Sequence, residues 1–215
     1  MKTSTMDIIH DLIVRYQKMF CIEENIAEAV NAMIDSYNSG GKLLICGNGG
    51  SASDALHIVG ELMKDFAVPR KISVEIQEKI KAIAGEHAEY ITSNLQGVLP
   101  AISLVSEISL ATAYANDCAP DLSFAQQVYG YGNSDDVLLG ISTSGNSKNV
   151  IYAAEVAKAK GIKVVGLTGA TGGRLKDCCD CLINVPETEA YKIQELHLPV
   201  YHVICLALEN EFFGE

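Results

Sequence analysis

The chain has 215 residues, of which 48% are hydrophobic and 20% are charged. This length and balance predict one globular domain with a core of its own and argue against a disordered chain. With 16 Lys and Arg against 27 Asp and Glu, the formal net charge is −11. Such a charge disfavours nonspecific binding to nucleic acid and to anionic membranes, so we expect neither among the partners.

The cysteines and the apolar runs indicate a compartment. Seven cysteines lie mostly in apolar runs, and their odd number favours free, reduced thiols. Cys178, Cys179 and Cys181 are clustered, but no second cysteine or histidine pair completes a zinc ligand set. No apolar run reaches the roughly 20 residues of a membrane-spanning helix, and the first residues lack the apolar stretch of a signal peptide. We therefore expect a cytoplasmic protein.

The first 40 residues are predicted to be a helical segment. Apolar residues recur at helical spacing between Met6 and Tyr37, with a break near residues 21–23. The pattern predicts two amphipathic helices that end at Ser39-Gly40-Gly41. They are expected to pack on the main body or on another subunit.

After residue 41 the pattern changes to short apolar strands that alternate with helices. Strands are predicted at residues 42–46, 99–104, 136–142, 163–168 and 181–185, with helices at 52–64, 105–114, 148–160 and 189–213. This alternation predicts an α/β fold with a parallel sheet covered on both faces. Ligands of such sheets bind beyond the carboxyl ends of the strands, which directs attention to the loops after residues 46 and 141.

Residues 67–98 interrupt this pattern and are predicted to be an insertion within the domain. Val74–Ile83 has the spacing of one helix, and a polar stretch follows it as far as Pro100. We interpret the segment as an insertion over the edge or the mouth of the sheet. A lid over the mouth is the alternative, since long loops at such places are often functional.

The loop after residue 141 is predicted to bind phosphate. Ser142, Thr143, Ser144 and Ser147 place four hydroxyls within six residues, directly before a helix. The unpaired N–H groups and the macrodipole at a helix start favour an anion there. A single Ser would be explained as an N-cap, but four hydroxyls favour a phosphate monoester. The loop at residues 47–51 lacks the Lys of a P-loop and the GxGxxG spacing, so a nucleotide is not indicated.

Two helices carry side chains suited to chemistry. His57 and Glu61 stand four residues apart and share a face of their helix. Gln194, His197 and His202 lie on the last helix among apolar residues. Each of these histidines alone is more often a buried structural residue. Together the two helices predict a site for a divalent metal or for proton transfer.

Several motifs in this order resemble the sugar isomerase (SIS) domain family. They are Cys-Gly-Asn-Gly-Gly-Ser (46–51), Asn116-Asp117, Ile-Ser-Thr-Ser-Gly-Asn-Ser (141–147), Leu-Thr-Gly (167–169) and Ile-Gln-Glu-Leu-His (193–197). More narrowly, the chain is similar to the sedoheptulose 7-phosphate isomerases, also called phosphoheptose isomerases. The resemblance implies a single SIS domain over residues 1–215. It also implies a flavodoxin-like, three-layer αβα sandwich with a five-stranded parallel sheet, preceded by the N-terminal helices.

The resemblance also implies an assembly and an activity. Members form homotetramers with active sites at the subunit interfaces, and they convert sedoheptulose 7-phosphate into D-glycero-D-manno-heptose 7-phosphate through an enediol. The product supplies the heptose of bacterial surface lipopolysaccharide. The alternative is a noncatalytic SIS protein that binds a phosphosugar or associates with the replication initiator.

By the same resemblance, individual residues are expected to have particular roles. Ser142, Thr143, Ser144 and Ser147 would hold the phosphate, and Glu61 and His202 would form the acid/base pair. The further sugar contacts would be Asn48, Gly49, Gly50, Ser51, Glu61, Asn116, Asp117 and Gln194. One Zn²⁺ per site would be held by His57, Glu61, Gln194 and His202.

Two residues depart from the family pattern. Tyr191 stands where members usually carry an acidic residue, three positions before Gln194. Pro199 lacks a backbone N–H and is expected to kink the last helix, which could displace His202. His197 is then the fallback for the imidazole of the acid/base pair.

Overall fold

The computed structural model describes residues 1–214, and a sheet of five parallel strands forms its centre. The strands are β1 (Leu43–Gly47), β2 (Ala101–Ser103), β3 (Val137–Ser142), β4 (Lys163–Gly169) and β5 (Cys181–Val185), in the spatial order β2-β1-β3-β4-β5. All four neighbouring pairs are parallel. The predicted α/β fold with a five-stranded parallel sheet is confirmed.

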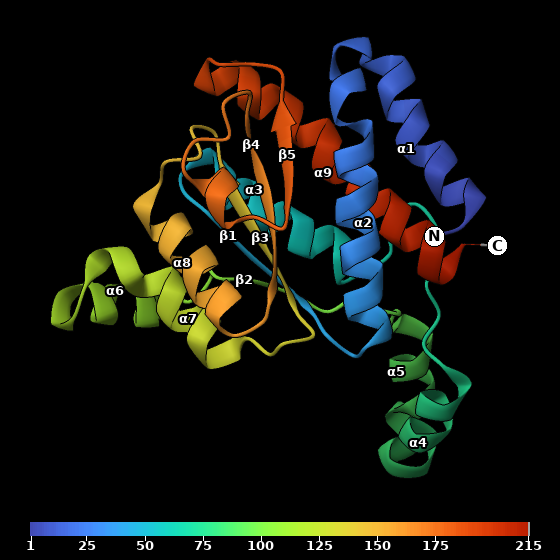
Figure 1. Cartoon of the computed structure of the whole chain (residues 1–215). Coiled ribbons are helices and arrows are strands. Elements are labelled where there is room, and N and C mark those ends of the chain that lie inside the picture. The colour runs from blue at the N-terminus through green and yellow to red at the C-terminus, as the bar shows by residue number, and fades with distance from the viewer. Residues whose placement is uncertain (215) are drawn as a thin grey trace.

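Helices cover both faces of this sheet and make the three layers seen in Figure 1. One face packs against α1 (Thr3–Arg15), α2 (Glu23–Asn38), α3 (Gly50–Leu62) and α9 (Ala190–Phe213). The other face packs against α7 (Ser123–Tyr131) and α8 (Lys148–Ala159). Because side chains alternate along a strand, Leu43 and Ile45 enter the first core, whereas Leu44 and Cys46 enter the second. Burial on both faces explains why β1 and β3 read as continuous apolar runs.

The strand order places the topological switch point between β1 and β3. The chain leaves β1 towards β2 on one side of the sheet and returns to β3 on the other side. The loops that follow β1 and β3 therefore meet at the carboxyl edge of the sheet, where open α/β sheets bind ligands. Within residues 1–214, no helix has both the length and the apolar character needed to cross a membrane.

The predicted helices need three corrections. The break between the N-terminal helices begins at Tyr16 and contains a 3-10 turn, Gln17–Ile22, so α2 starts at Glu23. The helix after β2 is α6 (Ile108–Asp117), which starts and ends three residues later than predicted. Helix α7 was not predicted at all. Its inward face is short and includes the polar Gln127, whose Nε2 donates to the Leu104 carbonyl.

Helix α9 runs unbroken from Ala190 to Phe213, with Pro199 inside it. His202 follows Pro199 by three residues, and its ring centroid lies 5.1 Å from that of His57 on α3. The displacement of His202 that Pro199 led us to expect is therefore not observed. His202 stays at the contact between α3 and α9.

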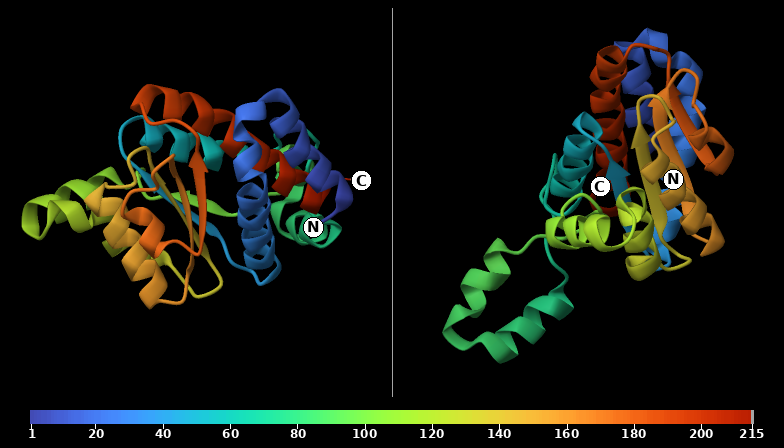
Figure 2. Two further views of the ribbon diagram at one scale, coloured as in Figure 1. Left: turned by 45° about the horizontal axis from the view of Figure 1, so that its top comes forward. Right: turned by 90° about the vertical axis from the view of Figure 1, so that its left-hand side faces the viewer.

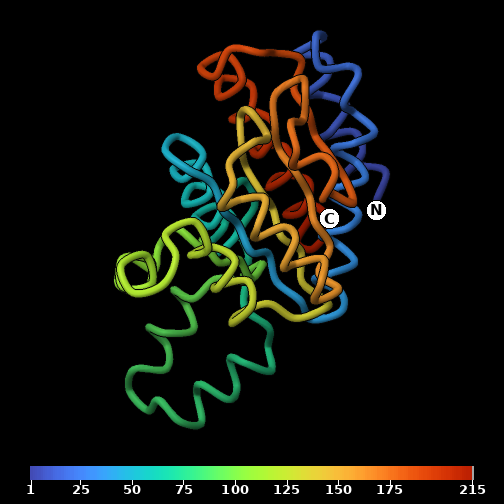
Figure 3. Tube along the Cα trace, turned by 60° about the vertical axis from the view of Figure 1, so that its left-hand side comes forward, coloured from blue at the N-terminus to red at the C-terminus, as the bar shows by residue number. Residues whose placement is uncertain are grey.

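Residues 67–98 form a helical hairpin that projects from the body of the molecule (Figures 2 and 3). It consists of α4 (Val74–Ala84), a 3-10 turn (Gly85–His87) and α5 (Ala88–Asn94), where a polar stretch was predicted after the first helix. The hairpin starts after α3 and leads into the amino end of β2, with the Leu99 N–H donating to the Leu62 carbonyl. It therefore leaves the sheet at the edge opposite the loops after β1 and β3, and it is not a lid over them.

Candidate functional site

The loop between β3 and α8 folds as a small cradle of hydroxyls. The Ser142 hydroxyl donates to the Ser147 hydroxyl at 3.1 Å, and the Asn146 N–H donates to the Ser144 hydroxyl at 3.1 Å. Gly145 turns the loop with φ +65°, and a Cβ added there would stand 2.0 Å from the Gly172 carbonyl oxygen. The loop is thus pressed against the one that follows β4. Thr143 is half-buried and Ser144 is exposed, so a ligand can reach both residues. The loop leads directly into α8, and the start of a helix favours an anion.

The loops after β1 and β3 are joined by a pair of amide groups. Asn48 and Asn149 exchange two hydrogen bonds, each of 2.9 Å between an amide nitrogen and an amide oxygen. Asn48 was expected to contact the sugar, but here its side chain holds the start of α8. Asn149 was not singled out from the sequence. It fixes the distance between the two loops at the switch point.

The start of α3 lies against the first turn of α9. A Cβ added to Gly50 would stand 2.4 Å from Nε2 of Gln194, so only a glycine lets the amide come this close. Gly49 has φ +56° and precedes the helix, while Ser51 is buried in its first turn. The expected sugar contacts Gly49, Gly50 and Gln194 are therefore brought together at the carboxyl edge of the sheet.

Further along the same two helices, Glu61 is the centre of a titratable cluster. Its side chain is 12% exposed, Oε1 is 3.0 Å from Nε2 of His57, and Oε2 accepts from the Lys64 ammonium at 3.2 Å. The ring of His202 faces that of His57 edge to face. Burial, and next the charge of His57, lower the pKa of His202, which favours its neutral form at neutral pH. A buried carboxylate beside a neutral imidazole can move protons on a bound substrate.

Two residues of this cluster were missed from the sequence. The hydroxyl of Tyr201 lies 2.9 Å from Nδ1 of His57, on the ring edge opposite Glu61. Asp54, one turn before His57 on α3, lies beside the same hydroxyl: burial raises its pKa, and Tyr201 acts in the opposite direction. The i, i+3, i+7 spacing of Asp54, His57 and Glu61 could have revealed the carboxylate. Tyr201 is 144 residues away in the chain and gave no such signal.

His197, the fallback candidate, is a core residue. It has no exposed surface, neither ring nitrogen has a hydrogen-bond partner among residues 1–214, and burial lowers its pKa to about 4. The imidazole is neutral at physiological pH and sealed from any substrate. His202, which lines a pocket of 230 Å³ together with Phe66 and Glu195, is the accessible one of the two.

The Asn116-Asp117 pair lies apart from the other candidates. Both residues are at the exposed end of α6, and the Asn116 amide donates to the Asp117 carboxylate at 2.8 Å. Helix α6 extends away from the sheet in Figure 1. The hydrogen bonds and ring contacts of the described residues do not connect this pair to the serine loop or to Glu61.

Of the four expected zinc ligands, His57, Glu61 and His202 lie together, but the set does not form a metal site. Their donor types suit zinc, and Nε2 of His202 is buried without a hydrogen-bond partner within residues 1–214. However, Nε2 of His57 is engaged by Glu61, and Gln194 lies beside Gly50 rather than in this cluster. In the described part of the chain, no three His, Cys, Asp or Glu side chains are arranged to hold a metal ion.

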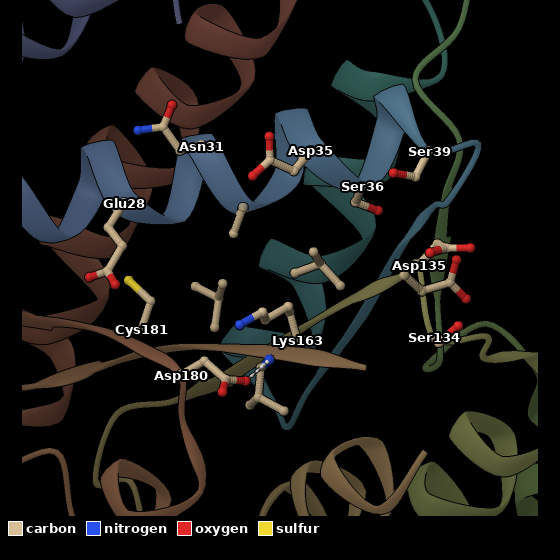
Figure 4. Close-up of a pocket in the computed structure, with 15 residues that line it drawn as sticks. Glu28, Asn31, Asp35, Ser36, Ser39, Ser134, Asp135, Lys163, Asp180 and Cys181 are labelled. Carbon is tan, nitrogen blue, oxygen red and sulfur yellow. Dashed lines mark hydrogen bonds between the residues drawn. The ribbon is translucent and has the colours of Figure 1, made fainter. Parts of the chain in front are cut away.

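A separate pocket of 380 Å³ opens at the amino ends of β3, β4 and β5, below α2 (Figure 4). It contains none of the site residues expected from the sequence. The carboxylates that line it outnumber its single cation, Lys163; they belong to Glu28, Asp35, Asp135, Asp136 and Asp180. This charge disfavours a phosphorylated sugar. The serine loop at the opposite edge remains the candidate anion site.

The chain resembles known proteins in sequence and in overall fold. The SIS domain family matches residues 12–91 and 83–169. The phosphoheptose isomerase of Burkholderia pseudomallei is 39% identical over 190 residues, which cover 88% of this chain and 83% of that protein. The solved phosphoheptose isomerase of Neisseria gonorrhoeae is 32% identical with a TM-score of 0.73, covering 94% of both chains. That of Francisella tularensis is also 32% identical, with a TM-score of 0.75 and 91% of both chains covered. The chain thus belongs to the SIS domain family and, within it, to the phosphoheptose isomerases.

Proposed function

We propose that the protein is a ketose–aldose isomerase that converts sedoheptulose 7-phosphate into D-glycero-D-manno-heptose 7-phosphate. The observation that carries this proposal is the cluster in which the buried carboxylate of Glu61 lies between His57 and Lys64, with the ring of His202 facing that of His57. A protein that only binds phosphosugars, or one that associates with a replication initiator, has no use for such a proton-transfer group. The noncatalytic alternative is therefore not favoured.

The reaction follows from two proton transfers on each side of an enediol. Glu61 removes a proton from C1 of the ketose, and the electron pair forms the C1–C2 double bond while His202 gives a proton to O2. His202 then takes the proton from O1 as the C1 carbonyl forms, and Glu61 returns its proton to C2. Each group ends in the protonation state in which it started. The serine loop holds the phosphate and orients the chain of the sugar without taking part in the chemistry.

We also propose that the working site needs two copies of the chain. Gln194 and His202 are eight residues apart on α9, which corresponds to about 12 Å along the helix axis. Gln194 lies near the carboxyl edge with the serine loop, whereas His202 and Glu61 lie farther down α9 and α3. A second copy that offers its own serine loop to this cluster would complete the site, consistent with a homotetramer.

Zn²⁺ is our proposal for the cofactor, with His57, Glu61, Gln194 and His202 as its ligands; because Gln194 lies beside Gly50 and away from the other three within one chain, it would be supplied by a second copy. The unpaired Nε2 of His202 and the donor types support it. When bound, the ion would polarise the substrate carbonyl. We propose the cytoplasm as the compartment, supported by the seven cysteines, all of which carry free thiols.

The function is tested by deuterium exchange. Incubated with sedoheptulose 7-phosphate in deuterated water, the protein should place deuterium at C2 of the aldose product. Glu61→Gln should lower the exchange rate by roughly 100-fold or more and still bind the phosphosugar, because it loses the base and keeps its shape. Glu75→Gln, on the exposed hairpin, is the matched control. Exchange in Glu61→Gln at the rate of this control would contradict the assigned role.

The shared site is tested by mixing inactive variants. Glu61→Gln lacks the base, and the double variant Ser144→Ala/Ser147→Ala lacks two phosphate contacts. If one site uses residues of two copies, co-assembled mixtures should regain part of the activity that each variant lacks alone. Mixtures that stay inactive, although they form mixed assemblies, would place the whole site within one chain.

A further inference from the structure

The side chain of Asn149 holds that of Asn48 by two hydrogen bonds at once. Nδ2 of each residue donates to Oδ1 of the other at 2.9 Å, so the two amide groups close a ring. Asn48 follows β1 and is exposed, whereas Asn149 is half-buried in the first turn of α8. A ligand at the carboxyl edge of the sheet can therefore reach the amide of Asn48, and the position of that amide depends on Asn149.

The main chain decides which way this pair of amides is turned. An asparagine amide can be turned over with little change in shape, which exchanges its donor and its acceptor. The Val150 N–H, however, donates to Oδ1 of Asn149 at 3.1 Å, in a bond that it shares with the Ser147 carbonyl. A backbone N–H can only donate, so the Asn149 atom that faces it must be the oxygen. Nδ2 of Asn48 then faces this oxygen, and Oδ1 of Asn48 faces the nitrogen of Asn149.

The pairing leaves half of the Asn48 amide free. An amide group has two N–H donors and two lone pairs on its oxygen, and the pair uses one of each. Within residues 1–214, the side chain of Asn48 makes no hydrogen bond besides the two to Asn149. One N–H and one lone pair are therefore left for a hydroxyl of a ligand, in directions that Asn149 sets.

The same pair connects the serine loop with the start of α3. Asn149 follows Ser147, the last hydroxyl of that loop, by two residues. On the other side, the Ser51 N–H donates to the Asn48 carbonyl at 3.0 Å, in the turn where Gly50 lies against Gln194. The pair thus fixes the spacing between the candidate phosphate site and the expected sugar contacts. A change in this spacing would misplace a sugar that is anchored by its phosphate.

We propose that Asn149 is a positioning residue for the sugar. It turns the Asn48 amide so that one N–H and one lone pair face a sugar hydroxyl, and it keeps that amide at a set distance from the serine loop. Asn48 makes the contact, and Asn149 acts through it. The contact with the sugar rests on the proposed function, whereas the direction of the Asn48 amide does not.

The direction of the amide is tested by NMR of protein labelled with 15N-asparagine. The side-chain signals of Asn48 are assigned by their loss in Asn48→Ala. In the unmodified protein we expect one of the two amide hydrogens of Asn48 to exchange slowly with water, because it is bound to Asn149. In Asn149→Ala the same hydrogen should exchange at least about 10-fold faster, since its acceptor is gone. This measurement needs neither substrate nor metal.

The effect on the sugar is tested by a double-mutant cycle. Asn149→Ala should lower kcat/KM about 10-fold, and Asn48→Ala should lower it by at least as much. Because Asn149 acts through Asn48, the double variant should lie within about 2-fold of Asn48→Ala and should not show the product of the two losses. The affinity of Asn149→Ala for inorganic phosphate, measured by calorimetry, should change by less than about 2-fold, since the serine loop keeps its hydroxyls. Asn31→Ala, on the exposed face of α2, is the matched control and should change none of these values.

An Asn48 amide hydrogen that exchanges equally fast in Asn149→Ala and in the unmodified protein would overturn the proposal. Losses that multiply in the double variant would overturn it as well, because Asn149 would then act on its own. If instead the amide responds as expected while the unmodified protein does not isomerise sedoheptulose 7-phosphate, the proposed function fails and the orientation of Asn48 by Asn149 stands.

Discussion

The buried ion pair between Arg70 and Glu209 should contribute strongly to stability. Both side chains are at most 1% exposed, and the Arg70 Nε donates to Glu209 at 2.7 Å. Arg70 also donates to the carbonyls of Glu61 and Leu62 at the end of α3. Glu209 in turn accepts from the N–H groups of three consecutive residues, Phe66, Ala67 and Val68. The pair therefore joins the end of α3, the base of the hairpin and α9.

Glu209→Gln keeps the shape of the side chain but removes its charge. Each carboxylate oxygen accepts two N–H donors, so the amide NH₂ must face donors in either orientation. The Arg70 guanidinium also stays buried without its counterion. Breaking such a pair costs about 3–5 kcal/mol, which corresponds to a fall of roughly 6–20 °C in melting temperature for a chain of this size.

Urea unfolding followed by circular dichroism measures this cost, with all proteins at one concentration because an oligomer's stability depends on it. The exposed pair of Glu75 and Lys79 on α4 supplies the control, since Glu75→Gln should change the stability by less than about 0.5 kcal/mol. If the free energy of unfolding of Glu209→Gln lies within about 1 kcal/mol of that of the unmodified protein, the buried ion pair does not stabilise the fold as its contacts indicate.

Three further outcomes follow from local geometry. Gly145→Ala should weaken phosphosugar binding and lower stability more than Gly161→Ala does. Both glycines have positive φ, which costs an alanine about 1–2 kcal/mol, but only at Gly145 does the added Cβ meet a backbone atom within 3 Å. Gly50→Ala should raise KM by displacing Gln194, whereas Gly60→Ala, in open space on the same helix, should raise stability by about 0.5–1 kcal/mol. Buried His197 has a pKa of about 4 against 6.5 when unfolded. Between these pH values the unfolded chain binds one proton more than the folded protein does. The free energy of unfolding should therefore fall by up to about 3 kcal/mol as the pH drops from 7 to 4. Urea unfolding of His197→Leu should show a smaller fall over the same pH range.

The sheet could be predicted from the sequence because its strands are buried on both faces. Runs such as Val137–Ile141 stay apolar without interruption, and that pattern has few other interpretations in an alternating chain. The short helix at Ser123–Tyr131 could not be found in this way, since its buried face includes Gln127, which is held by a main-chain carbonyl. Arg70 was hidden for a similar reason: within a polar stretch, nothing in the sequence tells a buried arginine from an exposed one.

The candidate site was predictable only where its residues share one helix or one loop. His57 and Glu61 form an i, i+4 pair, and the structure shows them hydrogen-bonded. The serine loop was likewise found from local composition, and Ser142 and Ser147 are in contact. Tyr201 and Asn149 depend instead on which helices pack together. Helix α9 is apolar around most of its circumference, so the face that meets α3 could not be chosen by periodicity.

The register of α3 on α9 is the feature that unites these observations. Gly50 admits Gln194 at one end of the contact, and the Asp54–His57–Glu61 stripe meets Tyr201 and His202 in the middle. At the other end, the bonds from Arg70 to the last carbonyls of α3 tie that helix to α9. A residue shifted by one position on a helix turns about 100° around its axis, so a slip of one residue would separate every one of these pairs. These contacts at both ends of the pair are therefore what keeps His57 on α3 within hydrogen-bonding distance of Tyr201 and in ring contact with His202, although α9 is more than 130 residues away in the chain.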